Sequence, residues 1–266
     1  MDERFVRKDE LKECPVCKES LELVFPNALM GQDFTVHRMC ACERKRNEEE
    51  TRAKRIREQQ MELETNRGVC FHEKRMLNWT FDLDNDKTPA MDKARLYVKH
   101  WEEARQNRAG LLLWGNVGSG KTYMSACIAN ALLDQGKKVL MTDFVSITNI
   151  STFDIHEYVN ALSNYDLLII DDLGAERKTE FAVQNVFDVI NRRWESGKPL
   201  IITTNLSLED IHNETEMAKG RIYDRILDMC TPIKVIGESK RMESADQKRD
   251  FFKEIFTTGK GGREHD

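Results

Sequence analysis

The sequence predicts an α/β fold in which a parallel sheet with crossover helices forms one large domain, preceded by a small cysteine-rich module and a charged helical linker. Four apolar runs of strand length alternate with stretches long enough to be helices, a pattern typical of parallel sheets. Four of the seven cysteines fall within the first 42 residues, and charged side chains dominate the segment after them. We therefore divide the chain into a cysteine-rich module at 1–43, a linker at 44–76, an α/β domain at 77–255 and a flexible tail at 256–266.

The composition is that of a globular, heavily charged protein. Hydrophobic residues make up 40% of the 266 positions, which excludes a wholly disordered chain, and charged residues reach 33% against a usual value of about 25%. The formal net charge of -5 gives no global positive field, so any contact with nucleic acid must come from a local patch. No apolar stretch is long enough to span a bilayer or to serve as a signal peptide, and we expect a cytoplasmic protein.

The four N-terminal cysteines have the spacing of a structural zinc site. Cys14 and Cys17 form a CxxC pair, and Cys40 and Cys42 form a CxC pair after 22 intervening residues. Four thiolates can bind Zn²⁺ tetrahedrally, and this crowding favours a metal in a reducing compartment over a disulfide framework. His37, three residues before Cys40, is an alternative fourth ligand. A redox-active CxxC pair and a set of unligated buried cysteines are further alternatives.

The linker pattern predicts a solvated helix. Between residues 43 and 67 there is no glycine or proline, and opposite charges recur four residues apart. The pairs are Arg44 with Glu48, Glu48 with Arg52, and Glu50 with Lys54. Such pairs stabilise a helix by only about 0.2 to 0.5 kcal/mol each, so a disordered charged linker is the alternative. Either structure separates two folded units.

The rest of the chain alternates between buried strands and helices. The apolar runs that we interpret as strands are 111–115, 138–144, 166–172 and 199–205. Between the last two runs, apolar residues of 179–195 recur mostly every three or four positions, which predicts an amphipathic helix that Gly197 and Pro199 end. Four buried strands separated by helices imply a parallel sheet.

A glycine-rich loop follows the first of these strands and precedes a helical run. Its sequence fits GxxxxGK[ST], the phosphate-binding pattern, in the strand-loop-helix context that this pattern requires. The loop consists of Gly115, Asn116, Val117, Gly118, Ser119, Gly120, Lys121 and Thr122. We expect its amides to cradle the phosphates of ATP, Lys121 to reach the terminal phosphates and Thr122 to bind Mg²⁺.

Polar side chains end the next strands of the predicted site. Asp171 and Asp172 end the run at 166–172, which we expect to neighbour the phosphate-loop strand. Asp171 suits the magnesium shell and Asp172 suits polarisation of the attacking water, with Glu176 as a further candidate base. Asn205, at the tip of the following strand, can orient water or sense the γ-phosphate. Carboxylates here can instead cap a helix, and asparagine before a turn is also ordinary.

Taken together, these motifs resemble a known family. GNVGSGKT, LLIIDDLGAE, LIITTN, GRIYDRI and GESKR occur in this order. The chain from about 77 to 255 is similar to the AAA+ ATPases of the bacterial and phage DnaC/DnaI helicase-loader group, whose near relatives include IstB-type transposition helpers. The resemblance implies a P-loop AAA+ (ASCE) three-layer sandwich with a parallel central sheet, and self-association through the ATPase domain.

The resemblance also implies roles for arginines near the C-terminus. In the family, an arginine of a Gly-Arg-x-x-x-Arg segment acts as a finger on the neighbouring subunit's ATP, and it corresponds to Arg221, with Arg225 as the alternative. The sensor-2 arginine corresponds to Arg241. An arginine finger can raise the rate by about 10³ to 10⁵. From spacing alone, Arg221 and Arg225 are also compatible with surface charges on a helix.

The resemblance implies a function that the residues alone do not fix. We expect an ATPase that loads a hexameric replicative DNA helicase onto single-stranded DNA, with ATP as the switch. The zinc module would grip the helicase, as loaders of the DnaI kind are built with an N-terminal zinc module. A transposition helper and a zinc-dependent DNA-binding regulator with a structural nucleotide site are the alternatives. A metabolic kinase is disfavoured because nothing in the chain resembles a small-molecule acceptor site.

Overall fold

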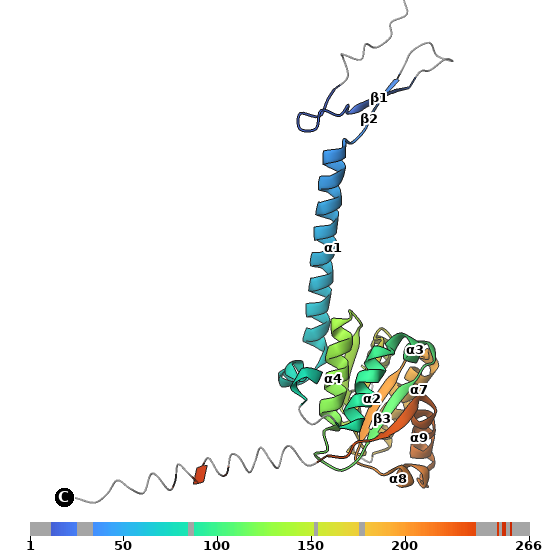
Figure 1. The fold of residues 1–266 in the computed structure, drawn as a ribbon. Coiled ribbons are helices and arrows are strands. Elements are labelled where there is room, and N and C mark those ends of the chain that lie inside the picture. The colour runs from blue at the N-terminus through green and yellow to red at the C-terminus, as the bar shows by residue number, and fades with distance from the viewer. Residues whose placement is uncertain are drawn as a thin grey trace, which may run out of the picture. The chain divides into compact units, whose positions relative to one another are not determined.

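The structure, a computed structural model, describes residues 12–25, 34–84, 88–151, 154–175 and 179–237, and positions 249, 252, 253 and 256. The chain forms two compact units, Met1–Glu62 and Leu63–Asp266 (Figure 1). Of the tail expected at 256–266, only the first residue lies within the described part. Among the described residues, no helix combines the length and the apolar character needed to cross a bilayer.

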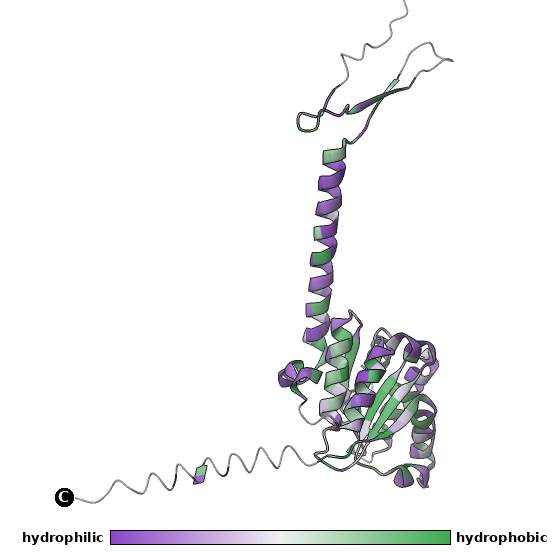
Figure 2. Ribbon diagram, in the orientation of Figure 1, coloured by the Kyte–Doolittle hydropathy of each residue, from purple (hydrophilic) through white to green (hydrophobic). Residues whose placement is uncertain are grey.

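The N-terminal unit contains a β-hairpin followed by most of a long helix. Its elements are β1 (Glu22–Phe25), β2 (Phe34–His37) and α1 (Ala41–Cys70), the last of which continues into the second unit. Helix α1 is hydrophilic along most of its length (Figure 2). Ion pairs four residues apart join Arg46 to Glu50 and Lys54 to Glu58. The charged linker is therefore helical, with ion pairs at the expected spacing but between other residues than expected.

The sheet of the second unit has five parallel strands in the order β4-β5-β6-β3-β7. The strands are β3 (Gly110–Trp114), β4 (Val139–Asp143), β5 (Leu167–Leu173), β6 (Leu200–Thr204) and β7 (Cys230–Lys234). The first four confirm the predicted strands. Strand β7 was not predicted, because Pro232 and two other exposed residues, Thr231 and Lys234, interrupt its apolar character. Proline is tolerated there because β7 is an edge strand.

Helices cover both faces of the sheet and complete the predicted three-layer sandwich. Side chains alternate along β3, so Leu111 and Leu113 pack into one core and Leu112 into the other. The helices of the first core are α2 (Pro89–Lys99), α3 (Trp101–Gln106) and α4 (Lys121–Asp134). Those of the second core are α5 (Phe144–Thr148), α6 (Ile155–Leu162), α7 (Glu180–Ser196), α8 (Leu208–His212) and α9 (Met217–Met229). Two 3₁₀ helices, η2 (Lys74–Asn78) and η3 (Phe81–Leu83), precede α2.

Helix α7 has the ends that its sequence predicts. The Ala182 amide donates a hydrogen bond to Thr179 Oγ1 at 3.2 Å, which caps the first turn. Gly197 follows the last turn with a φ of 63°, in the left-handed region that favours glycine. Val186 and Ile190, on the apolar face, are buried in the second core. The helix expected at 179–195 is confirmed to within one residue at either end.

Candidate functional site

The carboxyl ends of β3, β5 and β6 bring the residues of the predicted nucleotide site together. Strand β6 lies between β3 and β5, so the prediction that the acidic residues end a strand next to the phosphate-loop strand is wrong by one strand. The reason is topological: β6 follows both strands in the chain yet inserts between them, which no local pattern reveals. Asp171 and the phosphate loop still meet, across the tip of β6.

The phosphate loop connects β3 to the first turn of α4. A Cβ atom on Gly115 would lie 2.3 Å from the Val235 carbonyl oxygen, so only glycine fits against the chain that leaves β7. Gly118 and Gly120 have φ angles of 83° and 95°. Gly120 is the N-cap of α4, and no side chain caps this end of the helix. The first-turn amides and the helix dipole are thus arranged as in sites that bind a phosphate group.

Lys121 is held at the mouth of this loop. Its Nζ atom donates hydrogen bonds to the carbonyl oxygens of Gly115 and Asn116, both at 2.9 Å, and to Asn205 Oδ1 at 2.8 Å. The lysine is 5% exposed, so its ammonium group relies on these oxygens in place of water. The structure therefore joins Lys121 to Asn205, the polar residue expected at the tip of β6.

Asp171 forms the acidic half of the site. Thr122 Oγ1 donates a hydrogen bond to Asp171 Oδ2 at 2.9 Å, and the Thr203 hydroxyl donates to Asp171 Oδ1. Burial raises the pKa of Asp171, and the hydrogen bond from Thr203 opposes this rise. The hydroxyl and the carboxylate are hard oxygen ligands of the kind that Mg²⁺ prefers. Thr122 and Asp171, from different elements, thus fit the divalent ion expected with a nucleotide.

Asp172 is set apart from its neighbour by the local backbone. The register between β5 and β6 shifts between Ile170 and Leu173, and Asp172 has a φ of 60°, which is rare for a residue with a side chain. This bulge leaves Asp172 exposed while Asp171 is buried. One carboxylate is therefore placed for a metal and the next for solvent.

Thr203 joins these two positions, which the sequence analysis did not foresee. Its hydroxyl donates to Asp171 and accepts a hydrogen bond from the Asp172 amide at 2.9 Å, and the residue is fully buried. A threonine at a strand tip is unremarkable in sequence. Its role follows only from the insertion of β6 beside β5.

A cavity of about 270 Å³ lies beside the phosphate loop. Trp114, Ser119, Asn205 and Lys234 are among its lining residues. The Ser119 Oγ atom is buried and has no hydrogen-bond partner within the described part of the chain. Lys234 Nζ lies 5.0 Å from the centre of the Trp114 ring. An unpaired hydroxyl and a cation next to the loop are further groups that suit an anionic ligand.

The two candidate finger arginines differ sharply in environment. Arg225 lies over the rings of Phe187 and Trp194, at 4.8 and 5.6 Å from their centres, and donates to the Arg221 carbonyl oxygen. Arg221, one turn earlier on α9, is exposed. Arg225 therefore fastens α9 to α7, which leaves Arg221 as the arginine that faces outward. Arg241 and Glu176 lie outside the described residues.

The four N-terminal cysteines converge on one point. The Sγ atoms of Cys14, Cys17, Cys40 and Cys42 all lie within 4.8 Å of one another, and ligands at a Zn–S distance of about 2.3 Å would lie roughly 3.8 Å apart. The amides of Cys17 and Val16 lower the pKa of Cys14 to about 6, which favours its thiolate, whereas hydrogen bonds with Cys40 and Cys14 raise the pKa of Cys42 to about 12, so a metal ion must displace the Cys42 proton. This cluster could hold a metal ion, and it does not include His37, which lies on β2.

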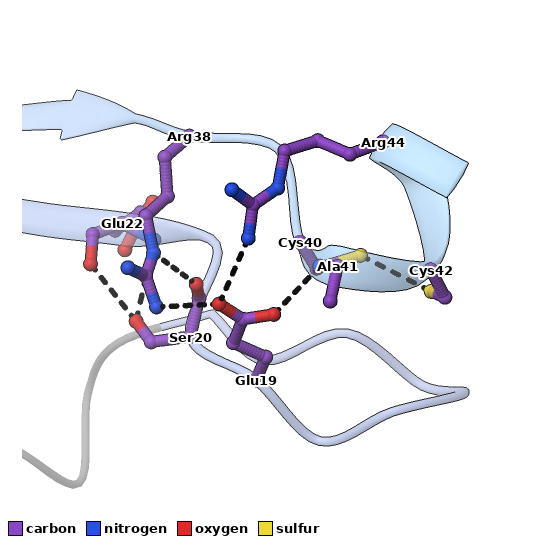
Figure 3. Close-up of polar contacts among 8 residues, drawn as sticks. All are labelled: Glu19, Ser20, Glu22, Arg38, Cys40, Ala41, Cys42 and Arg44. Carbon is purple, nitrogen blue, oxygen red and sulfur yellow. Dashed lines mark hydrogen bonds and ion pairs between the residues drawn. The ribbon is translucent and has the colours of Figure 1, made fainter. Parts of the chain in front are cut away.

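Glu19 connects the two halves of this cluster. Its Oε2 atom accepts a hydrogen bond from the Ala41 amide at 2.6 Å, and its Oε1 atom accepts one from Arg38 Nη2 at 3.1 Å (Figure 3). Arg44 lies 3.8 Å from the same carboxylate. One side chain next to the CxxC turn thus caps the helix that carries Cys42, which orients both cysteine pairs. No sequence motif singled out this residue.

Comparison with known proteins identifies a family. A sequence model of the family described as IstB-like ATP binding protein matches residues 43–248. The replicative helicase loader DnaC of Escherichia coli (strain K12) is 33% identical over 144 residues, which cover 52% of this chain and 56% of DnaC. The replicative helicase loader DnaI of Bacillus subtilis (strain 168) is 30% identical over 160 residues, which cover 54% of this chain and 51% of DnaI. The chain thus spans about half the length of these relatives.

A solved structure supports the fold independently. The crystal structure of DnaI superposes with a TM-score of 0.54 and 23% sequence identity, covering 63% of this chain and 96% of that chain. At this level of identity the likeness concerns the fold alone. It agrees with the predicted AAA+ sandwich and its five-stranded parallel sheet.

Proposed function

The chain belongs to the family of IstB-like ATP-binding proteins, and from this premise we propose that it is an ATPase that loads a hexameric replicative DNA helicase onto single-stranded DNA. Two of its relatives are named as replicative helicase loaders. ATP binding and hydrolysis would act as the switch of the loading cycle. Assembly of several copies would complete each site.

The observation that carries the proposal is the cluster at the carboxyl ends of β3, β5 and β6. Lys121, Thr122, Asp171 and Asn205 meet there through direct hydrogen bonds. The loop amides and Lys121 would bind the phosphates of ATP, and Thr122 and Asp171 would hold Mg²⁺. The ion, when bound, would supply positive charge at the β- and γ-phosphate oxygens.

The remaining site residues have roles in hydrolysis in this proposal. Asp172, exposed beside the metal position, would orient and polarise the attacking water, and Asn205 would sense the γ-phosphate through its link to Lys121. Arg221 of a neighbouring copy would stabilise the charge on the transferring phosphoryl group, and Arg241 would act as the sensor-2 arginine. Turnover would then depend on assembly.

The N-terminal unit would serve as the grip on the helicase. Its four cysteines would bind one Zn²⁺, which in so small a unit supplies much of the folding free energy. The domain division that we propose stays that of the sequence: the zinc module at 1–43, the linker at 44–76 and the ATPase at 77–255.

A second candidate is a transposition helper, because the motifs also resemble the IstB-type helpers and the matched family is described as IstB-like. The two functions differ in the protein that is bound. Purification of the tagged full chain from its native lysate, with ATP and Mg²⁺ present, followed by mass spectrometry of what remains bound, separates them. Retention of a replicative helicase by the parent chain, reduced in Lys121→Ala, supports the loader. Retention of a transposase instead would contradict it.

The zinc-dependent regulator has a different signature in solution. It would bind DNA as tightly in Lys121→Ala as in the parent chain, and the parent chain would show no ATP turnover. Either result alone is compatible with a loader under some conditions, whereas both together would favour the regulator.

A further inference from the structure

A groove of about 430 Å³ runs along the first half of α1. Its charged lining residues are Arg44, Arg52, Arg55 and Glu48, so three cations face one anion. These positions share one face of the helix, since they are separated by three, four, seven or eight residues or by eleven. The chain as a whole has a net charge of -5, so this groove is a positively charged patch on a negatively charged protein.

Two of the three groove arginines, Arg52 and Arg55, differ in their pairing from Arg46 and Lys54 on the same helix, whereas the third, Arg44, lies 3.8 Å from the Glu19 carboxylate. Arg46 and Lys54 each form an ion pair with a glutamate four residues further along the helix, at 4.0 and 3.9 Å. Within the part of the chain that the structure describes, Arg52 and Arg55 form no ion pair. Their charge is therefore available to an external anion, whereas that of Arg46 and Lys54 is partly neutralised.

Apart from Met39, the uncharged lining residues are polar and indicate the kind of anion. Thr51 and Asn47 line the same groove, and they add hydroxyl and amide groups beside the arginine forks. Arginine together with threonine and asparagine is the usual set of side chains that contact nucleic-acid phosphates and sugars. Arg52 and Arg55 are about 4.5 Å apart along the helix axis, and Arg44 is about 12 Å from Arg52, so the cations are strung along a line, as a linear polyanion requires.

We propose that this face of α1, defined by Arg44, Asn47, Thr51, Arg52 and Arg55, binds the phosphate backbone of a nucleic acid. The inference rests on the proposed function in that a loader must hold the strand that receives the helicase, and it names a contact surface outside the ATPase domain. Binding there depends on backbone charge and not on base sequence. It also does not depend on ATP, because none of its residues belongs to the nucleotide site.

A pair of charge-matched variants tests the proposal in the full chain. Arg52→Gln/Arg55→Gln removes the two unpaired groove cations, and Arg46→Gln/Lys54→Gln removes two cations that are already paired on the same helix. Binding of a labelled oligothymidylate and of a duplex of equal length is measured without nucleotide across a series of salt concentrations. The two DNA arms decide whether the backbone bound is single-stranded or double-stranded.

We expect the groove variant to bind DNA about tenfold or more weakly at low salt, and its plot of log affinity against log salt to be shallower by about 1.4 for the single strand. The control variant should bind like the parent chain. Equal loss in both variants would mean a general charge effect and would overturn the proposal. Parental binding by the groove variant would overturn it as well. A parallel titration with polyglutamate is the third arm: a larger loss of affinity for polyglutamate than for DNA would assign the groove to an acidic protein and would also overturn the proposal.

The result is separable from that of the loader proposal. If no helicase is retained but the groove variant loses DNA binding, the loader function fails and the groove stands. If a helicase is retained while the groove variant binds DNA like the parent chain, the groove assignment fails alone.

Discussion

At the scale of single residues, the candidate nucleotide site depends on a buried hydroxyl group. The Thr203 hydroxyl donates a hydrogen bond to the Asp171 carboxylate and accepts one from the Asp172 amide at the bulge of β5. Asp172 has a positive φ angle, which is a strained conformation for a residue with a side chain. The hydrogen bond from its amide to Thr203 helps to hold the backbone in this conformation. A residue outside the phosphate-binding motif can thus set the position of both carboxylates.

Replacing Thr203 by valine should lower ATP turnover about 10- to 100-fold, as loss of a group that orients metal ligands usually does. The variant should have a lower kcat and should need more Mg²⁺ to reach its maximal rate, whereas its ATP affinity should change less. Thr203→Ser should restore turnover because it keeps the hydroxyl. The matched control is Thr204→Val, since Thr204 is equally buried but donates to the Leu173 carbonyl oxygen and not to a carboxylate. Equal effects of both valine variants would refute this role.

The raised pKa of Asp171 makes a prediction about stability and pH. An acid whose pKa is higher in the folded state destabilises the fold when it ionises. The free energy of unfolding should therefore fall as pH rises from the pKa of the unfolded chain, about 3.9, through the raised pKa of Asp171 in the folded chain. Asp171→Asn should therefore unfold at higher denaturant concentration than the parent chain at pH 8. The difference should shrink toward pH 4. A difference that grows as pH falls would contradict the direction of this shift.

At the scale of elements, local sequence patterns predict individual strands, helices and loops, but they do not predict edge strands or the order of strands in the sheet. Four strands, helix α7 and the phosphate loop follow from apolar periodicity, caps and glycine spacing, because each is determined by neighbours in sequence. Strand β7 was not predicted because a half-exposed edge strand lacks a continuous apolar run. The insertion of β6 between β3 and β5 was not predicted because the order of strands depends on the whole sheet and not on any one segment.

The candidate site shows the same division between what sequence predicts and what it cannot. Lys121, Thr122, Asp171 and the four cysteines were named from motifs, and the structure brings them into two clusters. Thr203 was recognised only as one of the polar residues that end its strand, and Glu19 was not named, because each acts by hydrogen bonds to residues brought close only by folding. The stacking of Arg225 on aromatic rings of α7 is likewise a tertiary contact.

The cysteine cluster predicts a metal content. The purified chain should contain about one zinc ion per molecule, and Cys14→Ser/Cys17→Ser should contain none, because two ligands on one knuckle are lost. Cys127→Ala is the control, since this cysteine is buried in α4 and is not one of the four clustered cysteines. Elemental analysis of the three proteins decides the matter. Zinc retained in the double variant, or absent from the parent chain, would refute the assignment.

At the scale of the whole molecule, we propose that the chain combines a nucleotide site with surfaces that bind partners. Arg221 is exposed on α9, whereas Arg225 is engaged within its own copy. A site that needs an arginine from a neighbour couples hydrolysis to assembly. The unpaired arginines of α1 add a second surface, in the other compact unit.

The trans arrangement predicts complementation between two inactive variants. Lys121→Ala is expected to lose phosphate binding but keep the finger, and Arg221→Ala is expected to bind ATP but lack the finger. Each alone should turn over little ATP, and an equimolar mixture should recover a part of the parental rate because some interfaces combine an intact site with an intact finger. Full parental activity of Arg221→Ala under assembling conditions would show that Arg221 is not the finger.

We expect the loop at Gly115–Thr122 and the Thr122–Asp171 pair to form an ATP site that uses magnesium. Calorimetric titration of ATP into the full chain, with and without Mg²⁺, measures this binding. One ATP should bind per chain, with an affinity that rises when Mg²⁺ is present and is lost in Lys121→Ala. Absence of ATP and ADP binding in the presence of Mg²⁺, or equal binding by Lys121→Ala, would contradict it.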